Sequence, residues 1–339
     1  MDVIAVESAV LMKIVPGSHM ECPSNFDMKV RRWVVYFLAI SILFILWKLT
    51  IIQTDVEKLQ FLKDTLYLNK EQLQLSHQQL ILIEHLYQAK LGKEQPMIYA
   101  ITPTYSRYVQ KAELTRISQT LALVPNVHWI LVEDSDEKTD LVRNLVADSN
   151  LLVTHLSIKT PVYEKLGDED PRWLKHRGVE QRNLALKWLR ENLQHGKDKG
   201  VVYFMDDDNT YSVKLFKEIA KVKKVGVWPV GLVGGLNAET LILDPNTGKV
   251  TGYRSGWKAD RKFAIDMAGF AINLDLILAK SQAAFSYRME KGFQESEFLS
   301  YFTTKEELEP LADNCTKVYV WHTRTEKPNV KGVVPGLEV

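Results

Sequence analysis

A 20-residue apolar run, Trp33–Ile52, constrains the fold of this 339-residue chain more than any other feature. Lys48 is its only charged residue, and the run is long enough to cross a bilayer as an α-helix. Lys29, Arg31 and Arg32 precede it, and this excess of positive charge places the N-terminus in the cytosol. The run lies too far from residue 1 to be an ordinary cleaved signal peptide. We therefore predict a single-pass type II membrane protein, with a buried core helix as the alternative.

The segment after this run has the pattern of a long helix. Residues 53–94 contain no proline and no glycine before Gly92. Their apolar residues recur at heptad spacing: Leu59, Leu62, Leu66, Leu73, Leu80, Ile83 and Tyr87. This spacing is typical of a short coiled-coil stem that pairs two chains, so a homodimer is expected. A single amphipathic helix packed on the globular part is the alternative.

The rest of the chain alternates between strand-like and helix-like segments. Strands are expected at 97–101, 129–133, 151–156, 201–205 and 225–230, and helices at 111–123, 178–193 and 213–222. Such alternation builds an α/β fold with a mostly parallel, doubly wound sheet. From Gly231 onward, glycines and the turn at 244–248 interrupt the pattern, which marks a second half of different organisation.

Three adjacent carboxylates follow one of these expected strands. Asp206, Asp207 and Asp208 come directly after the apolar run 201–205. Like charges at a strand end raise one another's pKa values unless a cation lies among them. Ligands of open α/β sheets bind just outside the carboxyl ends of the strands. A divalent metal bridging a nucleotide diphosphate is therefore one interpretation, and a solvated turn is the other.

Charge and cysteine content exclude some classes of protein. The formal net charge is +1, which gives no whole-chain case for nucleic acid binding. Cys22 and Cys315 are the two cysteines and are expected on opposite sides of the membrane, so no intramolecular disulfide framework is expected. Asn314-Cys315-Thr316 is an N-glycosylation sequon, consistent with lumenal exposure.

Several ordered segments resemble one known family. They are Ala100–Arg107, Val132–Asp134, Arg177-Gly178 with Gln181–Leu186, Tyr203–Tyr211, Val233–Leu236, Asp266–Ala271, Gln294–Ser296 and Val320–Pro328. Together they resemble the Golgi β-1,3-glucuronyltransferases of the GT-A fold, glycosyltransferase family 43. The resemblance covers essentially residues 95–328, and this family also has a type II anchor and a stem.

The resemblance divides the chain into functional regions. It implies a cytoplasmic tail at 1–32, a transmembrane signal anchor at 33–52, a helical stem at 53–94, a Rossmann-like UDP-sugar-binding half at 95–230 and an acceptor-binding half at 231–339. It implies that residues 53–339 lie in the Golgi lumen.

The resemblance also implies a donor site for UDP-glucuronate and Mn²⁺. Asp208 is expected to bind the metal directly, with Asp206 and Asp207 orienting the ribose, metal waters or the ligand shell. The metal would neutralise the UDP leaving group, so that no general acid is needed. The other expected donor contacts are Pro103, Thr104 and Tyr105 on the uridine, Asp134 on the uracil, Arg177 and Arg182 on the glucuronate carboxylate and diphosphate, and His322, Thr323 and Arg324 over the diphosphate.

On the acceptor side the resemblance makes Glu295 the general base. It would deprotonate the 3-hydroxyl of a terminal galactose, and in-line attack would invert α-linked UDP-glucuronate to a β-glucuronide. Glu297 is the local rival. The expected galactose contacts are Glu239, Trp257, Arg261 and Asp266.

Two positions depart from the family pattern. Tyr108 and His176 stand where many members have proline, which removes a φ restraint near the nucleotide. The tail after Pro328 is also short, which leaves acceptor contacts in trans open.

The physiological acceptor stays open between the Gal-Gal-Xyl linker of proteoglycans and terminal N-acetyllactosamine, with a broad range that includes the linker preferred. Two other functional classes compete with the transferase. A haloacid-dehalogenase phosphatase could use the Asp-x-Asp-x-Thr pattern at 206–210, although that motif normally follows the first strand of its domain. A catalytically inactive Golgi glycan-binding or scaffold protein of the same fold is the main alternative.

Overall fold

The computed structural model describes residues 24–90, 95–167, 170–171, 174–326, 328–330 and 332. These residues belong to two units, one ending at Asn69 and one beginning at Lys70, and each is described by itself. Cys22, most of the predicted tail, the end of the stem and residues 333–339 lie outside the described part.

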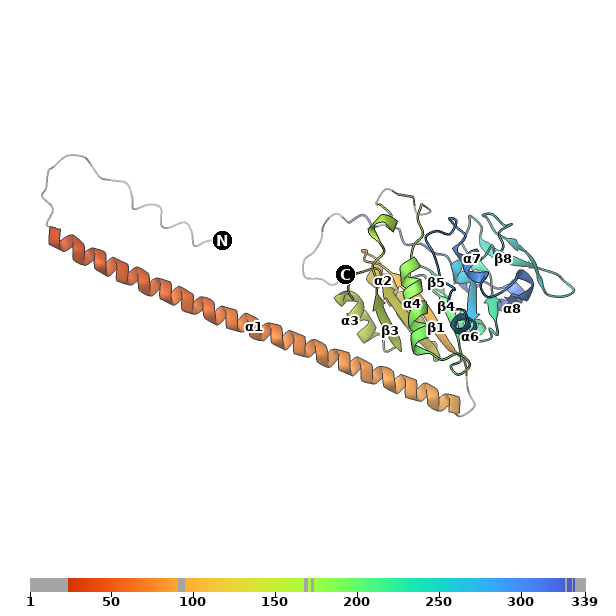
Figure 1. Cartoon of the computed structure of the whole chain (residues 1–339), viewed down its shortest axis with the longest axis horizontal. Helices are drawn as coiled ribbons and strands as arrows, with labels where there is room; N and C mark the ends of the chain where they lie inside the picture. The colour runs from red at the N-terminus through yellow and green to blue at the C-terminus, as the bar shows by residue number, and fades with distance from the viewer. Residues whose placement is uncertain are drawn as a thin grey trace. The chain divides into compact units, whose positions relative to one another are not determined.

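The N-terminal unit is helical. Helix α1 (Ser24–Lys90) runs without a break through the predicted anchor and most of the predicted stem (Figure 1). Within it, Val35–Leu80 contains a stretch that is long and apolar enough to cross a membrane. The heptad side chains Leu59, Leu62 and Leu66 are exposed. The pairing of two chains through this face stays a prediction.

The globular unit is built on two sheets (Figure 1). The larger has seven strands in the order β11-β6-β10-β4-β1-β2-β3. Its strands are β1 (Met97–Thr104), β2 (Val127–Glu133), β3 (Val153–Ser157), β4 (Gly200–Phe204), β6 (Val225–Val227), β10 (Phe270–Asn273) and β11 (Glu309–Pro310). The four strands β3, β2, β1 and β4 are parallel, whereas β10 is antiparallel to both of its neighbours.

The smaller sheet has five strands in the order β5-β12-β7-β8-β9. These are β5 (Thr210–Tyr211), β7 (Val230–Gly231), β8 (Ala238–Leu243), β9 (Val250–Arg254) and β12 (Val320–Trp321). Strand β5 comes from the first half of the chain, while β10 and β11 of the larger sheet come from the second. Each sheet therefore contains strands from both sides of the predicted boundary at 230/231. The division into a UDP-sugar-binding half and an acceptor-binding half stays a prediction about function.

Helices cover both faces of the larger sheet because its strands carry apolar side chains on both faces. Along β1, Ile98 and Ala100 belong to one buried cluster and Tyr99 and Ile101 to the other. The first cluster packs against α2 (Gln110–Leu121), α3 (Asp140–Asp148) and α5 (Val213–Ile219). The second packs against α4 (Val179–Asn192), α6 (Leu274–Ala279) and α7 (Gln294–Leu299). The short elements are η1 (Val162–Glu164), η2 (Met267–Gly269), η3 (Lys305–Glu307) and α8 (Ala312–Cys315).

The predicted α/β class is confirmed, and so is the convergence of strand ends. Because β1, β2 and β4 are parallel, their carboxyl ends meet at one edge of the sheet. Asp134 N donates to the Thr104 carbonyl at 2.8 Å, and Met205 N donates to the Ile101 carbonyl at 2.8 Å. The polar residues that follow these strands are therefore held side by side.

Candidate functional site

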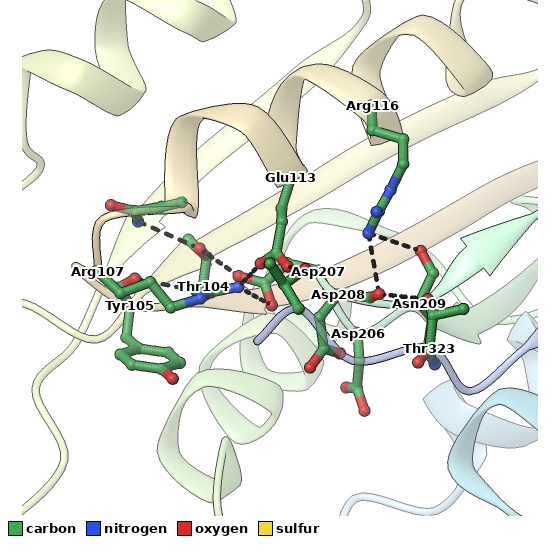
Figure 2. A network of polar contacts seen from close by, with 12 residues as sticks. Thr104, Tyr105, Arg107, Glu113, Arg116, Asp206, Asp207, Asp208, Asn209 and Thr323 are labelled. Atoms are coloured by element: carbon green, nitrogen blue, oxygen red, sulfur yellow. Dashed lines mark hydrogen bonds and ion pairs between the residues drawn. The ribbon is translucent and has the colours of Figure 1, made fainter. Parts of the chain in front are cut away.

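The three aspartates after β4 have different surroundings (Figure 2). Asp206 Oδ1 lies 2.5 Å from Arg182 Nη2. Asp207 is buried, with Oδ1 2.7 Å from Arg107 Nη2. Among the described contacts, none joins a cation or a donor to the carboxylate of Asp208. The third aspartate is therefore the one whose charge is left to be neutralised by something else.

Electrostatics supports the same distinction. Burial, followed by the charges of Asp206, Asp207 and Glu113, raises the pKa of Asp208 to about 6. A cation bound to this carboxylate would relieve that repulsion. Within the described residues, no group of three or more His, Cys, Asp or Glu side chains forms a metal cage. The donor set therefore fits a hard divalent cation that takes one carboxylate from the protein and other oxygen ligands from a diphosphate or water.

The residues after β1 hold Asp207 in place. Thr104 Oγ1 donates to Asp207 Oδ2 at 2.7 Å, so this hydroxyl is used inside the site. Pro103 is half-buried at the end of the same strand. Tyr105 is 46% exposed, and the Arg107 guanidinium lies 4.4 Å from its ring centroid. The aromatic ring of Tyr105 is thus exposed enough to stack on a nucleotide base.

Asp134, the predicted uracil contact, binds the loop that follows β3. Its Oδ1 accepts from Thr160 N at 2.7 Å, and its Oδ2 accepts from Thr160 Oγ1 at 2.8 Å. Lys165 Nζ lies 3.6 Å from Oδ1. The Asp134 side chain is 21% exposed, and its contacts with Thr160 and Lys165 hold this loop against the end of β2. Its contact with uracil stays a prediction.

Arg177 and Arg182 differ sharply although five residues separate them. Arg182 is buried, pairs with Asp206, and donates through Nη1 to the Arg177 carbonyl at 2.8 Å. Arg177 is exposed, and none of the described contacts engages its guanidinium. Gly178 caps α4 with φ of 70°, and a Cβ there would lie 2.5 Å from Arg182 Nη1. Arg182 is thus part of the carboxylate cluster, and Arg177 is the one available to an anion.

The segment after β12 closes one side of the site. His322 N donates to the Gly231 carbonyl at 2.8 Å, and Thr323 Oγ1 donates to the Asp208 carbonyl at 2.6 Å. Arg324 is exposed. An open pocket of about 460 Å³ lies here, lined by Leu232, Val233, Gly234, Gly235, His322, Thr323 and Arg324. Thr323 therefore contacts the third aspartate, while the binding of a diphosphate by residues 322–324 stays a prediction.

Glu295 is the second residue of α7 and is half-buried, whereas its rival Glu297 is exposed. Burial, followed by the charge of Asp266, raises the pKa of Glu295 to about 7, against the opposing effect of Arg261 and Arg182. A carboxylate with such a pKa is suited to take a proton near neutral pH. The Arg182 guanidinium lies 5.8 Å from the Phe285 ring centroid, and Phe285 stacks on Phe298 of α7, so α7 lies near the carboxylate cluster.

The other predicted acceptor residues surround a loop and a tryptophan. Glu239 is buried, and its Oε1 accepts from Ser255 Oγ at 2.7 Å and Gly256 N at 2.9 Å. Trp257, the next residue, is 41% exposed, with the Arg261 guanidinium 4.7 Å from its ring centroid. Arg261 also donates to the Gly292 carbonyl at 2.6 Å. Glu239 and Arg261 thus fix the position of Trp257.

Asp266 joins the two halves of the site. Its Oδ1 accepts from Ala268 N at 2.9 Å at the start of η2, and its Oδ2 lies 3.0 Å from His322 Nδ1. The sequence assigned Asp266 to the acceptor side and His322 to the donor side. The structure brings them into direct contact.

Three residues around the aspartates were not predicted from the sequence. Arg107 precedes α2, and Glu113 and Arg116 lie on it. Arg116 Nη2 donates to the carbonyls of Asp208 at 2.9 Å and Asn209 at 3.3 Å (Figure 2). The sequence signal that could have identified Glu113 and Arg116 is their spacing: they are charged residues three positions apart on the helix that follows the first strand.

The two departures from the family pattern have different surroundings. Tyr108 is 61% exposed. His176 Nε2 lies 2.8 Å from the Met289 carbonyl, which ties this loop to the segment before α7. Asn314 of the sequon is exposed and belongs to a turn, Ala312–Cys315, with φ between 50° and 59°.

Comparisons with known proteins found a matching family and several similar relatives. Residues 117–326 match the family model described as Glycosyltransferase family 43. The chain is 54% identical over 240 residues to galactosylgalactosylxylosylprotein 3-beta-glucuronosyltransferase I of Drosophila melanogaster, which covers 70% of this chain and 78% of the relative. It is 53% identical over 245 residues to galactosylgalactosylxylosylprotein 3-beta-glucuronosyltransferase 3 of Mus musculus, covering 70% and 72% of the two chains.

Among solved structures, S. aureus TarS 1-349 in complex with UDP-GlcNAc aligns with a TM-score of 0.44 and 16% sequence identity. The alignment covers 68% of this chain and 59% of that one.

Proposed function

This chain belongs to glycosyltransferase family 43 and is a glycosyltransferase, and we propose that it transfers glucuronic acid from UDP-glucuronate to the 3-hydroxyl of a terminal galactose, with inversion. One observation carries the proposal. Asp206 and Asp207 are each paired with a guanidinium, while the described contacts include none for the carboxylate of Asp208. This leaves one carboxylate for a metal-bound diphosphate and keeps Glu295, on the other side, for the acceptor.

On the donor side, Mn²⁺ held by Asp208 would supply Lewis-acid stabilisation of the UDP leaving group. Pro103, Thr104 and Tyr105, at and just after the end of β1, would hold the uridine, with the exposed Tyr105 ring stacking on the base. Arg177 and Arg324 are exposed, and the segments that carry them are joined to the aspartates through Arg182 and Thr323, so both guanidiniums are suited to the carboxylate and phosphate oxygens of the donor. Arg182 acts through Asp206, which it holds at 2.5 Å.

On the acceptor side, Glu295 takes the proton from the attacking hydroxyl. Its pKa of about 7 makes it a stronger base than an ordinary carboxylate while leaving much of it ionised near neutral pH. Trp257 offers a pyranose an exposed ring, and Arg261 and Glu239 hold that ring in place. Asp266 is a further hydroxyl partner, next to His322.

The names of these relatives include galactosylgalactosylxylosylprotein as the acceptor. We extend this acceptor to the present chain, within a broader range of galactosides. We further propose a Golgi membrane location, with α1 as the single-pass anchor, the globular unit in the lumen, N-glycosylation at Asn314 and a homodimer joined through the stem.

An acceptor and donor panel tests the proposed reaction. The full-length chain in detergent would be given UDP-glucuronate, UDP-GlcNAc or UDP-galactose, with a Gal-Gal-xyloside, N-acetyllactosamine or no acceptor. We expect Mn²⁺-dependent, acceptor-dependent UDP release from UDP-glucuronate alone, and a β-1,3 linkage in the product. Turnover of another donor would refute the donor assignment. Binding of UDP-glucuronate with no turnover of any acceptor would instead support an inactive glycan-binding protein.

A further inference from the structure

Helix α2 carries two charged side chains that face the aspartates. Glu113 and Arg116 are three residues apart, so they lie on the same face of the helix (Figure 2). Arg116 donates to the Asp208 carbonyl at 2.9 Å. The Glu113 carboxylate is only 3% exposed and contacts Arg107, which in turn lies 2.7 Å from Asp207. A helix with no predicted role in binding thus contacts both Asp207, through Arg107, and Asp208.

Glu113 is unusual because it adds a buried negative charge to a region that already holds three carboxylates. Its charge contributes to raising the pKa values of Asp207 and Asp208. A buried carboxylate of this kind is costly unless specific partners satisfy it. Glu113 has two: Arg107 contacts Oε2, and Thr325 Oγ1 donates to Oε1. One partner belongs to the aspartate cluster, and the other to the segment after β12.

That segment, which we call the C-terminal strap (His322–Thr325), alternates in its contacts. The Thr323 hydroxyl donates to the Asp208 carbonyl, and the Thr325 hydroxyl donates to Glu113. Arg324, between them, is exposed. Alternation of this kind is that of an extended segment, in which every second side chain points the same way. The two threonines therefore attach the strap to the aspartates and α2, while Arg324 is left for a ligand.

We propose that Glu113 is a positioning residue that latches the C-terminal strap over the donor site through Thr325. The latch fixes the places of His322 and Arg324 beside the open pocket and connects them, through Arg107, to Asp207. This inference rests on the proposed function, because it assigns the strap to donor binding. It predicts that substitutions of Glu113 and Thr325 raise the donor KM more than the acceptor KM.

The test is a set of four variants of the full-length chain: Thr325→Val, Thr325→Ser, Glu113→Gln, and Thr325→Val combined with Glu113→Gln. Steady-state kinetics with Mn²⁺, UDP-glucuronate and a Gal-Gal-xyloside would give the KM for each substrate, and thermal unfolding would give Tm. Thr251→Val is the control, because the Thr251 hydroxyl also donates one hydrogen bond, in its case to the Ile242 carbonyl at 3.1 Å on the β8–β9 hairpin.

We expect Thr325→Val to raise the donor KM about 10-fold, the range for loss of a hydrogen bond to a charged group. The acceptor KM should change much less, and Tm should fall below that of Thr251→Val because the buried Glu113 carboxylate loses a partner. Thr325→Ser should keep most of the donor affinity. In the Glu113→Gln background, Thr325→Val should raise the donor KM by less than about 2-fold more, because the effects of substitutions within one hydrogen-bond network are not additive.

Other results overturn the latch and leave the proposed function standing. These are an unchanged donor KM in Thr325→Val, equal increases in donor and acceptor KM, or multiplicative effects of the two substitutions. If the wild-type chain transfers no glucuronic acid from UDP-glucuronate, the proposed function itself fails. The two failures are therefore distinguishable in the same assay.

Discussion

Nδ1 of His322 lies 3.0 Å from Oδ2 of Asp266, and this contact joins the proposed donor side of the site to the proposed acceptor side. The hydrogen bond with Asp266 is the main cause of a raised His322 pKa. The same carboxylate is the second cause, after burial, of the raised pKa of Glu295. Asp266 therefore acts electrostatically on both the proposed base and a proposed diphosphate contact.

The pKa of Glu295 predicts the pH dependence of transfer. Because Glu295 must be ionised to accept a proton, kcat/KM for the acceptor should fall as pH decreases through about 7. The expected acid limb has a slope of about one, for a single group. A pH–rate profile with saturating UDP-glucuronate and Mn²⁺ measures it. Rates that stay constant down to about pH 5, well below the Glu295 pKa, would contradict the assignment.

Removal of the Asp266 charge should move that acid limb. In Asp266→Asn a negative neighbour of Glu295 is lost, so the Glu295 pKa falls and the acid limb shifts to lower pH. The His322 pKa should fall as well, because its main partner is lost. Asp260→Asn, an exposed carboxylate in the same segment of the chain, is the control. An acid limb at the same pH in Asp266→Asn and wild type would refute the electrostatic coupling.

The raised pKa of Glu295 also affects folding stability, with a definite sign. A carboxyl whose pKa is higher in the folded state favours folding most when it is protonated, so its contribution is present at low pH and is lost as pH rises through about 7. Replacing it with the neutral Gln should therefore raise Tm relative to wild type more at pH 8 than at pH 5. Thermal unfolding at the two pH values measures this. A larger gain at pH 5 would show that the Glu295 pKa is not raised.

Asp208 is predicted to determine the metal dependence of nucleotide binding. Asp208→Ala removes the one carboxylate of the three aspartates that has no described protein partner, so Mn²⁺ should no longer strengthen UDP binding. Calorimetric titration of UDP with and without Mn²⁺ measures the difference. Asp136→Ala, whose side chain is 69% exposed and pairs only with Lys159 among described contacts, is the control. An unchanged Mn²⁺ effect in Asp208→Ala would refute the ligand assignment.

Gly178 is predicted to be required for the Arg182–Asp206 pair. An alanine there meets a backbone φ of 70° and places its Cβ 2.5 Å from Arg182 Nη1. Gly196 provides the matched control, because its φ is 75° but no atom lies within 4 Å of an added Cβ. Gly196→Ala should therefore cost only the backbone strain, about 1–2 kcal/mol. Gly178→Ala should cost more than that and weaken UDP binding, as measured by chemical denaturation and titration. Equal losses of stability would show that Arg182 moves freely.

Much of this organisation was predictable from the sequence because its signals are local. The apolar runs before Thr104, Glu133 and Asp206 gave strands, and their parallel arrangement brought those residues to one edge. Helix α3 was not predicted, because a helix of nine residues gives only a short periodic pattern. The places of β10 and β11 were not predictable either, because they depend on pairing across long sequence separations.

The roles within the site were less predictable than its members. Arg182 was expected to bind a ligand anion, but it lies buried against Asp206, because burial of a guanidinium depends on packing that the sequence does not show. Thr104 uses its hydroxyl on Asp207 for the same reason. Arg107 and Glu113 were missed because each contacts residues from a different element. A sequence motif thus identifies which residues lie in the site, whereas the contacts that each side chain makes there depend on the tertiary structure.

The most direct test of the account is transfer by Glu295→Gln compared with its affinity for UDP. This substitution removes the proposed base while keeping the shape of the side chain, and Glu295 is not among the expected nucleotide contacts. Transfer should fall by a factor of about 10² to 10⁴, the range for loss of a general base, while Mn²⁺-dependent UDP binding stays at the wild-type value. Near-wild-type transfer by Glu295→Gln would contradict the proposed mechanism.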